Sequence, residues 1–135
     1  MKKLSILLSA LILCALAPEA KAQTSMGACA YSPGALKSAY KEMITVSTAA
    51  IGFTTATYRP ASTSGQPPAV CALVTVNTNS ISWWPTGATP TAADGLITGS
   101  GVSFWVGSSD LARLLMIRAG ASDAAVAVLY FTPIS

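Results

Sequence analysis

The sequence predicts an all-β protein, an antiparallel β-sandwich or jelly-roll-like fold of about seven to eight short strands. Between residues 81 and 131, short apolar runs alternate with clusters of Gly, Ser, Asp and Pro at nearly regular spacing. These clusters predict turns, because Gly adopts positive φ and Asp or Ser can hydrogen-bond to nearby backbone. Farther upstream, residues 44–47 and 70–76 are mostly β-branched, which favours strands.

Residues 1–22 have the three parts of a secretory signal peptide. Two lysines follow Met1, residues 4–17 form an apolar run broken only by two serines, and residues 20–22 are Ala-Lys-Ala before Gln23. The run has 14 residues, fewer than the roughly 18 to 20 that span a bilayer. We therefore expect cleavage after Ala22, export to the periplasm or the extracellular space, and no membrane span after processing.

Residues 23–135 carry five Lys or Arg and four Asp or Glu side chains, a net charge of +1. The +3 of the whole chain includes the lysines of the leader. A nearly neutral chain lacks the basic face that attracts nucleic acid, so we expect no nucleic-acid partner. The chain also has no His, which excludes Ser-His-Asp and Cys-His catalysis and His-containing metal sites.

Cys29 and Cys71 are the two cysteines beyond the leader. In an exported protein an even pair of cysteines indicates a disulfide. This bond would close a loop of roughly 40 residues and contribute about 4 kcal/mol in the chain-entropy model. The alternative is two separately buried thiols, which would instead indicate a cytoplasmic protein.

Residues 23–43 are expected to form a loose lead-in followed by one short N-terminal helix. Ser32 and Pro33 are typical of a helix start, with Ser as the cap and Pro in the first turn. Apolar residues recur at helical spacing within 35–43, and two lysines fall on the opposite face. We expect this helix to pack on the sheet, and a helix that binds a partner is the alternative.

Residues 44–135 are predicted to form the β-sandwich domain. A tight turn at 77–80 is expected to join the strands on either side of it as a hairpin, and residues 85–94 are expected to form a wide loop. The predicted strands are 44–47, 49–58, 70–76, 81–84, 96–98, 102–106, 111–118 and 124–131.

The last predicted strand, 124–131, is apolar on both of its faces. A strand of a half-exposed sheet should alternate apolar and polar residues, so two apolar faces indicate cover on both sides. Part of that cover is expected to be another subunit, which predicts an oligomer. The alternative is a sandwich whose own helix and loops cover the second face.

No set of residues in the sequence is typical of an active site, so we expect no enzyme, no cofactor and no metal. Asp94, Asp110 and Asp123 each lie beside Gly, Ser or both in predicted turns. Asp is common at such positions because its side chain stabilises the turn. We therefore interpret these residues as turn-forming rather than as a carboxylate pair or a calcium loop.

Trp83, Trp84, Trp105 and Tyr130 are the candidate binding or interface residues. They could form a platform on which sugar rings stack, or they could belong to the core and to subunit contacts. Because neighbouring residues of a strand point to opposite faces, either Trp83 or Trp84 should be in the core. The other should be exposed or covered by a neighbouring molecule.

The segment at 81–96, Ile-Ser-Trp-Trp-Pro-Thr-Gly-Ala-Thr-Pro-Thr-Ala-Ala-Asp-Gly-Leu, resembles one that is common in small tailed-phage structural proteins. There a strand is followed by a loop of the type Gly-x-x-Pro-Thr and then by Gly-Leu. The likeness covers roughly residues 44–131, and its motifs are of low specificity. It implies a small β-sandwich that decorates or builds a particle, with no catalytic residues to carry over. The leader and the disulfide depart from that family, whose members usually assemble in the cytoplasm.

The sequence therefore predicts a non-enzymatic structural or assembly protein, similar to phage virion accessory or decoration proteins. It would act by self-association or by docking on a larger particle, and would be virion-associated if the resemblance holds. The alternative is a secreted β-sandwich module that recognises carbohydrate or a cell surface.

Overall fold

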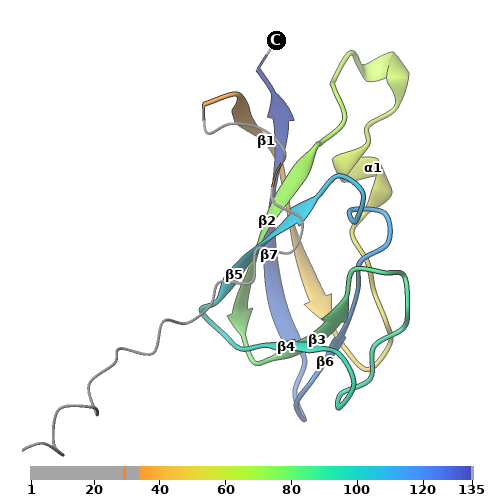
Figure 1. Ribbon diagram of the computed structural model, residues 1–135, viewed down its shortest axis with the longest axis vertical. Coiled ribbons are helices and arrows are strands. Elements are labelled where there is room, and N and C mark those ends of the chain that lie inside the picture. Colours follow the sequence, from red (N-terminus) through yellow and green to blue (C-terminus); the bar gives the residue numbers. More distant parts are fainter. Residues whose placement is uncertain (1–28, 30–33, 135) are drawn as a thin grey trace, which may run out of the picture.

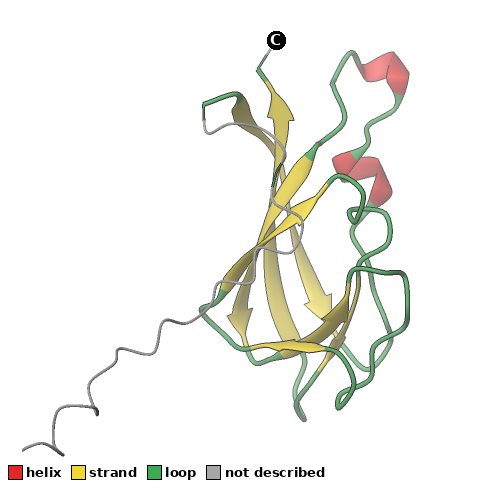
Figure 2. Ribbon diagram, in the orientation of Figure 1, coloured by secondary structure: helices red, strands yellow, loops and turns green. Residues whose placement is uncertain are grey.

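The computed structural model describes residue 29 and residues 34–134. In this part the chain forms two antiparallel sheets, drawn in Figure 1, which enclose a common core. Figure 2 shows that helical structure is limited to two short segments. The predicted all-β antiparallel sandwich is therefore confirmed. The signal peptide predicted at 1–22 and the helix start predicted at Ser32 and Pro33 lie outside the described residues.

Seven strands make up the two sheets. The larger sheet has the order β1-β7-β2-β5 and the smaller sheet the order β4-β3-β6. Within residues 34–134, no helix is long and apolar enough to cross a membrane. The elements are β1 (Leu36–Val46), α1 (Thr55–Tyr58), a 3₁₀ turn (Ser62–Ser64), β2 (Cys71–Thr78), β3 (Ile81–Trp84), β4 (Leu96–Thr98), β5 (Ser103–Gly107), β6 (Leu115–Arg118) and β7 (Ala124–Pro133).

Strand β1 corrects the sequence prediction, which placed a helix at residues 32–43. Residues 36–46 pair with β7 along their length. A β-bulge between Ser38 and Tyr40 inserts an extra residue and interrupts the two-residue alternation. Apolar residues before and after the bulge are consequently three or four positions apart, which imitates a helical pattern. The sandwich therefore begins at Leu36 rather than at residue 44.

The hairpin predicted between 70–76 and 81–84 is also wrong. Strand β2 pairs with β7 and β5 in the larger sheet, whereas β3 pairs with β4 and β6 in the smaller one. Because both edges of β2 are occupied, the chain crosses to the other sheet between Thr78 and Ile81. Asn79 lies in this turn with a φ of 58°, and its side-chain Nδ2 donates a hydrogen bond to the Asp123 carbonyl at 2.7 Å.

Two predicted strands are extended over only part of their length. Within residues 111–118, the strand is limited to β6, and the preceding turn buries Leu111 and Leu114. Within residues 49–58, Ile51 forms an isolated bridge to β6 and residues 55–58 form α1. Apolar composition alone therefore did not distinguish these buried turns from strands.

One end of the core is built on an aromatic stack between the two sheets. Trp83 of β3 lies against Phe104 of β5, with ring centroids 4.2 Å apart and ring planes 8° from parallel. The indole N–H of Trp83 donates to the Thr98 hydroxyl at 2.9 Å. This bond satisfies the polar atom of a ring that is otherwise buried.

The other end of the core is built on Tyr130 of β7. Its side chain is fully buried, and the ring centroids of Phe53 and Tyr58 lie 5.8 and 6.0 Å from its own. Both of these residues come from the segment between β1 and β2, whose helix α1 lies away from the smaller sheet (Figure 1). The helix and its loops therefore cover the inner face of the larger sheet.

The loop at 85–95 packs on the outer side of the smaller sheet. Pro90 and Ser82 are buried there, and a Cβ on Gly95 would lie only 2.1 Å from the Ser82 Oγ. The same Cβ would lie 3.2 Å from the backbone N of Trp83 and 3.3 Å from the Cβ of Pro90. A residue without a side chain is therefore required at position 95.

We predict that Gly95→Ala lowers the free energy of unfolding by about 2 to 4 kcal/mol, because the added methyl group overlaps the Ser82 hydroxyl. Ser82→Ala alone should change stability by less than about 1 kcal/mol, since no described residue hydrogen-bonds to that buried hydroxyl. Denaturant unfolding of both single variants and the double variant measures their coupling. The double variant should recover at least about 1 kcal/mol, and strictly additive effects would contradict the contact.

Candidate binding surface

The four aromatic candidates lie in different environments. Trp83 and Tyr130 belong to the core, with 5% and 0% of their surface exposed. Trp84 follows Trp83 in β3, points to the opposite face as expected, and is half-buried. Trp105 lies in β5 of the larger sheet and is 37% exposed. The structure therefore does not bring these residues together into one aromatic platform.

Trp105 belongs to a surface on the outer side of the larger sheet. Its ring centroid lies 5.2 Å from that of Phe131 in β7. The registers of β1, β7, β2 and β5 align outward-pointing side chains in rows across the strands. We call the two central rows together the outer face. One row is Lys41, Leu129, Leu73 and Trp105, and the other is Met43, Ala127, Thr75 and Ser103.

The outer face is largely apolar and accessible. Met43 is 65% exposed, and Leu129 and Trp105 are each 37% exposed. An open groove of about 540 Å³ lies over β1, β7 and β2, with Met43, Leu73 and Leu129 among its lining residues. Large apolar side chains exposed on neighbouring strands form a patch, and such patches in soluble proteins mark surfaces for association.

Lys41 is the charged side chain of the outer face. Among the described residues no carboxylate pairs with its ammonium group, and the ion pair found there joins Arg118 and Asp123 near the β6–β7 turn. Glu42, the next residue of β1, bonds toward the interior instead. The outer face therefore has positive charge at its β1 side and neutral side chains elsewhere.

Glu42 makes a polar contact inside the sandwich. Its carboxylate accepts a hydrogen bond from the Tyr130 hydroxyl and another from the backbone N–H of Thr54 at 3.2 Å. Burial raises the pKa of Tyr130 above its ordinary value, and the neighbouring Glu42 carboxylate raises it further. The contact links β1 and β7 to the residue that precedes α1.

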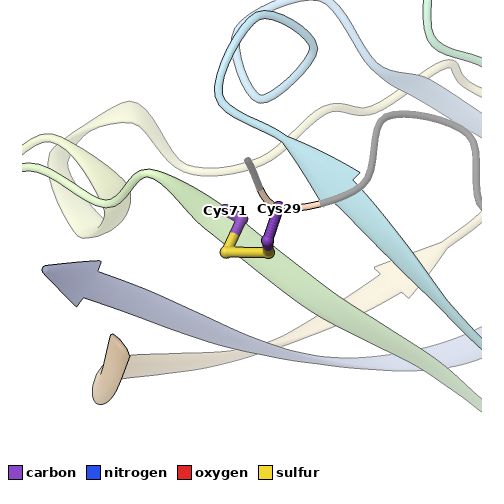
Figure 3. Close-up of a disulfide and its surroundings, with 2 residues drawn as sticks. All are labelled: Cys29 and Cys71. Atoms are coloured by element: carbon purple, nitrogen blue, oxygen red, sulfur yellow. A yellow bond between two sulfur atoms is a disulfide. The ribbon is translucent and has the colours of Figure 1, made fainter. Parts of the chain in front are cut away.

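Cys29 and Cys71 form a disulfide, which is the pairing that the sequence predicted (Figure 3). Cys71 is paired with Phe131 of β7 on one side and with Gly107 of β5 on the other. Alternation along β2 places its side chain on the same side of the sheet as Leu73. The disulfide therefore holds Cys29 beside one end of the outer face.

The three aspartates that were predicted to form turns do so. Asp94 exchanges backbone hydrogen bonds with Thr91, the Asp110 carbonyl accepts the N–H of Leu114 at 2.8 Å, and Asp123 lies in the β6–β7 turn. In the part of the chain that the structure describes, no three or more His, Cys, Asp or Glu residues are grouped to hold a metal ion. These residues therefore shape the loops of the sandwich.

Sequence reasoning missed Met43 and Leu73 as surface residues. The helix predicted at 32–43 assigned Met43 to an apolar face that packs on the sheet, and the strand predicted at 70–76, which contains Leu73, was assigned no exposed apolar face. The available signal was the apolar outer side of β7, which the sequence did indicate. The bulge between Ser38 and Tyr40 hid the matching alternation in β1.

Comparisons of the chain with protein-family models, with curated proteins and with solved structures found no match. The outer face itself offers an apolar area, one ammonium group, and the hydroxyls of Thr75 and Ser103, whose oxygen atoms lie 2.8 Å apart. Groups of this kind bind a partner by packing and desolvation.

We predict that Cys29→Ser lowers the free energy of unfolding by about 3 to 4 kcal/mol, because the disulfide closes a loop with a sequence separation of 42 residues. Guanidinium unfolding of the variant and of the wild type, with and without reductant, measures the effect. The reduced wild type should match the variant. Equal stability of the oxidised and reduced wild type would contradict the assignment of this stabilisation to the disulfide.

We predict that Tyr130 makes stability fall at alkaline pH. The unfolded chain loses the phenol proton near its ordinary pKa of about 10, whereas the folded chain keeps it because the pKa is raised. The contribution of this group is therefore complete below about pH 10 and is lost as the pH rises further. Unfolding free energies at about pH 8 and about pH 11 should decrease less for Tyr130→Phe than for the wild type. Identical decreases in the two proteins would refute the role of Tyr130.

Proposed function

We propose that this chain is a non-enzymatic structural or assembly protein, which acts by self-association or by docking on a larger particle. The association surface in this proposal is the outer face of the larger sheet. The observation that carries the proposal is an apolar sheet surface that stays exposed in the folded chain, with Met43 65% exposed and Leu129 and Trp105 each 37% exposed.

Strand β7 supports the same surface. Its inward residues are buried, and its outward residues, including Ala127 and Leu129, are apolar as well. The sequence left two candidates for the outer cover, another molecule or the chain's own helix and loops. Phe53 and Tyr58, from the segment that contains α1, pack on the inner side against β7. Their position favours another molecule as the cover.

The proposal includes export and a role in a particle. The leader-like residues 1–22 support export to the periplasm or the extracellular space, and the disulfide is compatible with that location. The likeness of residues 81–96 to small tailed-phage structural proteins supports an accessory or decoration role in a virion. A phage-derived domain used outside the inner membrane would combine both features.

A secreted module that binds carbohydrate or a cell surface is the second candidate, and Trp105 is the observation that favours it. Its indole is 37% exposed and lies on the same face as the hydroxyls of Thr75 and Ser103. An exposed indole beside hydroxyl groups can stack on a sugar ring while the hydroxyls bond to it. Trp83 and Tyr130 would not contribute, because both are buried.

We predict that residues 23–135 associate in size-exclusion chromatography with light scattering, and that Leu129→Lys weakens this association at least about 10-fold. The new ammonium group would be buried without a partner at the contact. Ile97→Lys is the matched control, because Ile97 is 61% exposed on the smaller sheet. Both variants should fold like the wild type, since each replaces a partly or largely exposed residue.

One combination of results would contradict the assembly role. A protein that is monomeric at every concentration, binds glycans on an array, and loses that binding in Trp105→Ala would overturn the assembly role. The carbohydrate-binding module would then replace it.

A further inference from the structure

The outer face carries a groove at one side and, at the other, the ring of Trp105, which packs beside Phe131 and is 37% exposed. Lys41 in β1 and Trp105 in β5 are the two ends of one row, with Leu129 and Leu73 between them. The groove lies over β1, β7 and β2, beside Lys41 and Met43. Neighbouring strands are about 4.8 Å apart, so Lys41 and Trp105 of one chain are separated by roughly 14 Å. Lys41 and Trp105 therefore cannot contact each other within one chain.

A two-fold axis can bring these features together between two chains. The axis lies in the plane of the face, runs parallel to the strands, and passes between β7 and β2. It places β1 of one copy over β5 of the other, and β7 over β2. Because positions along the strands are unchanged, the rows stay aligned, so Lys41 faces Trp105 and Leu129 faces Leu73 of the second copy.

We propose that a second copy of this chain occupies the outer face, with Trp105 of each copy in the groove of the other and the Lys41 ammonium group against the indole ring. This inference rests on the proposed function and specifies the partner and the geometry. It makes the contact isologous, so the same residues contribute from both chains.

Charge complementarity selects this arrangement. An ammonium group over the face of an indole is attracted by its negative π-surface. The two Lys41 side chains, which carry the charge of the outer face, remain on opposite sides of the dimer. An axis perpendicular to the strands would instead place β1 over β1 and bring the lysines toward each other, which like-charge repulsion disfavours.

The apolar centre of the face fits the same arrangement. Leu129 and Leu73 of one copy would pack on Leu73 and Leu129 of the other, away from the charged ends. The Thr75 and Ser103 hydroxyls already bond to each other at 2.8 Å, so covering them leaves fewer unsatisfied polar groups. The contact therefore has an apolar centre at Leu129 and Leu73 and includes the polar groups of Lys41, Thr75 and Ser103.

The size of the face is compatible with a small interface. The whole outer side of the larger sheet, of which the outer face is the centre, has four strands at about 4.8 Å and an average of about eight residues at about 3.4 Å, which gives about 500 Å² per copy. Two faces together bury about 1,000 Å², the lower limit for a specific interface. We therefore expect a dimer that dissociates on dilution, which sedimentation at several concentrations can follow.

Cross-linking between two different cysteine variants tests the geometry. Lys41→Cys and Trp105→Cys chains are mixed and treated with a bismaleimide shorter than about 14 Å. We expect a cross-linked dimer in the mixture and little in either variant alone, because like residues lie at opposite sides of the dimer. The mixed dimer keeps one intact contact between Lys41 and Trp105. Ile97→Cys mixed with Lys41→Cys is the control and should give no product.

The outcomes separate this inference from the proposed function. A dimer in sedimentation without the mixed product, or equal cross-linking in Lys41→Cys alone, overturns the geometry and leaves the association role intact. If the cross-linked dimer forms only after deletion of residues 23–28, the N-terminal segment of the same chain occupies the outer face in the full protein. That result would overturn the proposal that a second copy occupies it. A protein that stays monomeric at all concentrations would also overturn the dimer. The assembly role itself fails only if the monomer also binds glycans and Trp105→Ala abolishes that binding.

Substitution of Lys41 gives a second, independent measurement. Lys41→Met keeps an apolar side chain of similar length and removes the charge, so the dissociation constant of the dimer should rise about 5- to 30-fold, since two contacts are lost. Lys41→Arg keeps the charge and should dimerise like the wild type. Equal dimerisation of Lys41→Met and wild type would overturn the contact with Trp105.

Discussion

The pairing of β7 with both β1 and β2 is the interaction on which the rest of the structure depends. The last strand of the chain lies inside the larger sheet and joins the first strand on one side and the middle of the chain on the other. Side chains alternate between the two sides of a strand, so one register fixes which residues enter the core. A slip by one residue would exchange Val128 and Tyr130 with Leu129 and Phe131.

This alternation gives the larger sheet two apolar sides with different surroundings. The inner side is covered by the smaller sheet and by the segment that contains α1, and Tyr130 is buried there against Phe53 and Tyr58. The outer side keeps Met43 and Leu129 accessible. Apolar area that stays exposed to water does not stabilise the protein. Its burial becomes favourable only when a further surface covers it. The same strand pairing that builds the core therefore also builds the surface that we propose for assembly.

How much the sequence could predict depended on whether the relevant interaction was local. Most strands after residue 70 were found because Gly, Ser and Asp turns delimit them. Strand β1 was missed because the bulge between Ser38 and Tyr40 disrupts its alternation, and the turn at 77–80 is compatible with a hairpin or a crossover until the partners of β2 are known. The same limit applies to the surface. The apolar outer side of β7 was visible in the sequence, but the exposure of Trp105 and the burial of Trp83 depend on which sheet each strand joins.

Hydroxyl-radical footprinting of residues 23–135 across a concentration series tests most directly whether the outer face is covered in the assembled protein. Mass spectrometry follows the oxidation of Met43 and Trp105, with Ile97 on the smaller sheet as the internal reference. We expect Met43 and Trp105 to become protected as the concentration rises, while Ile97 keeps its reactivity. Oxidation of Met43 and Trp105 that stays the same while the protein associates would show that the outer face is not the contact.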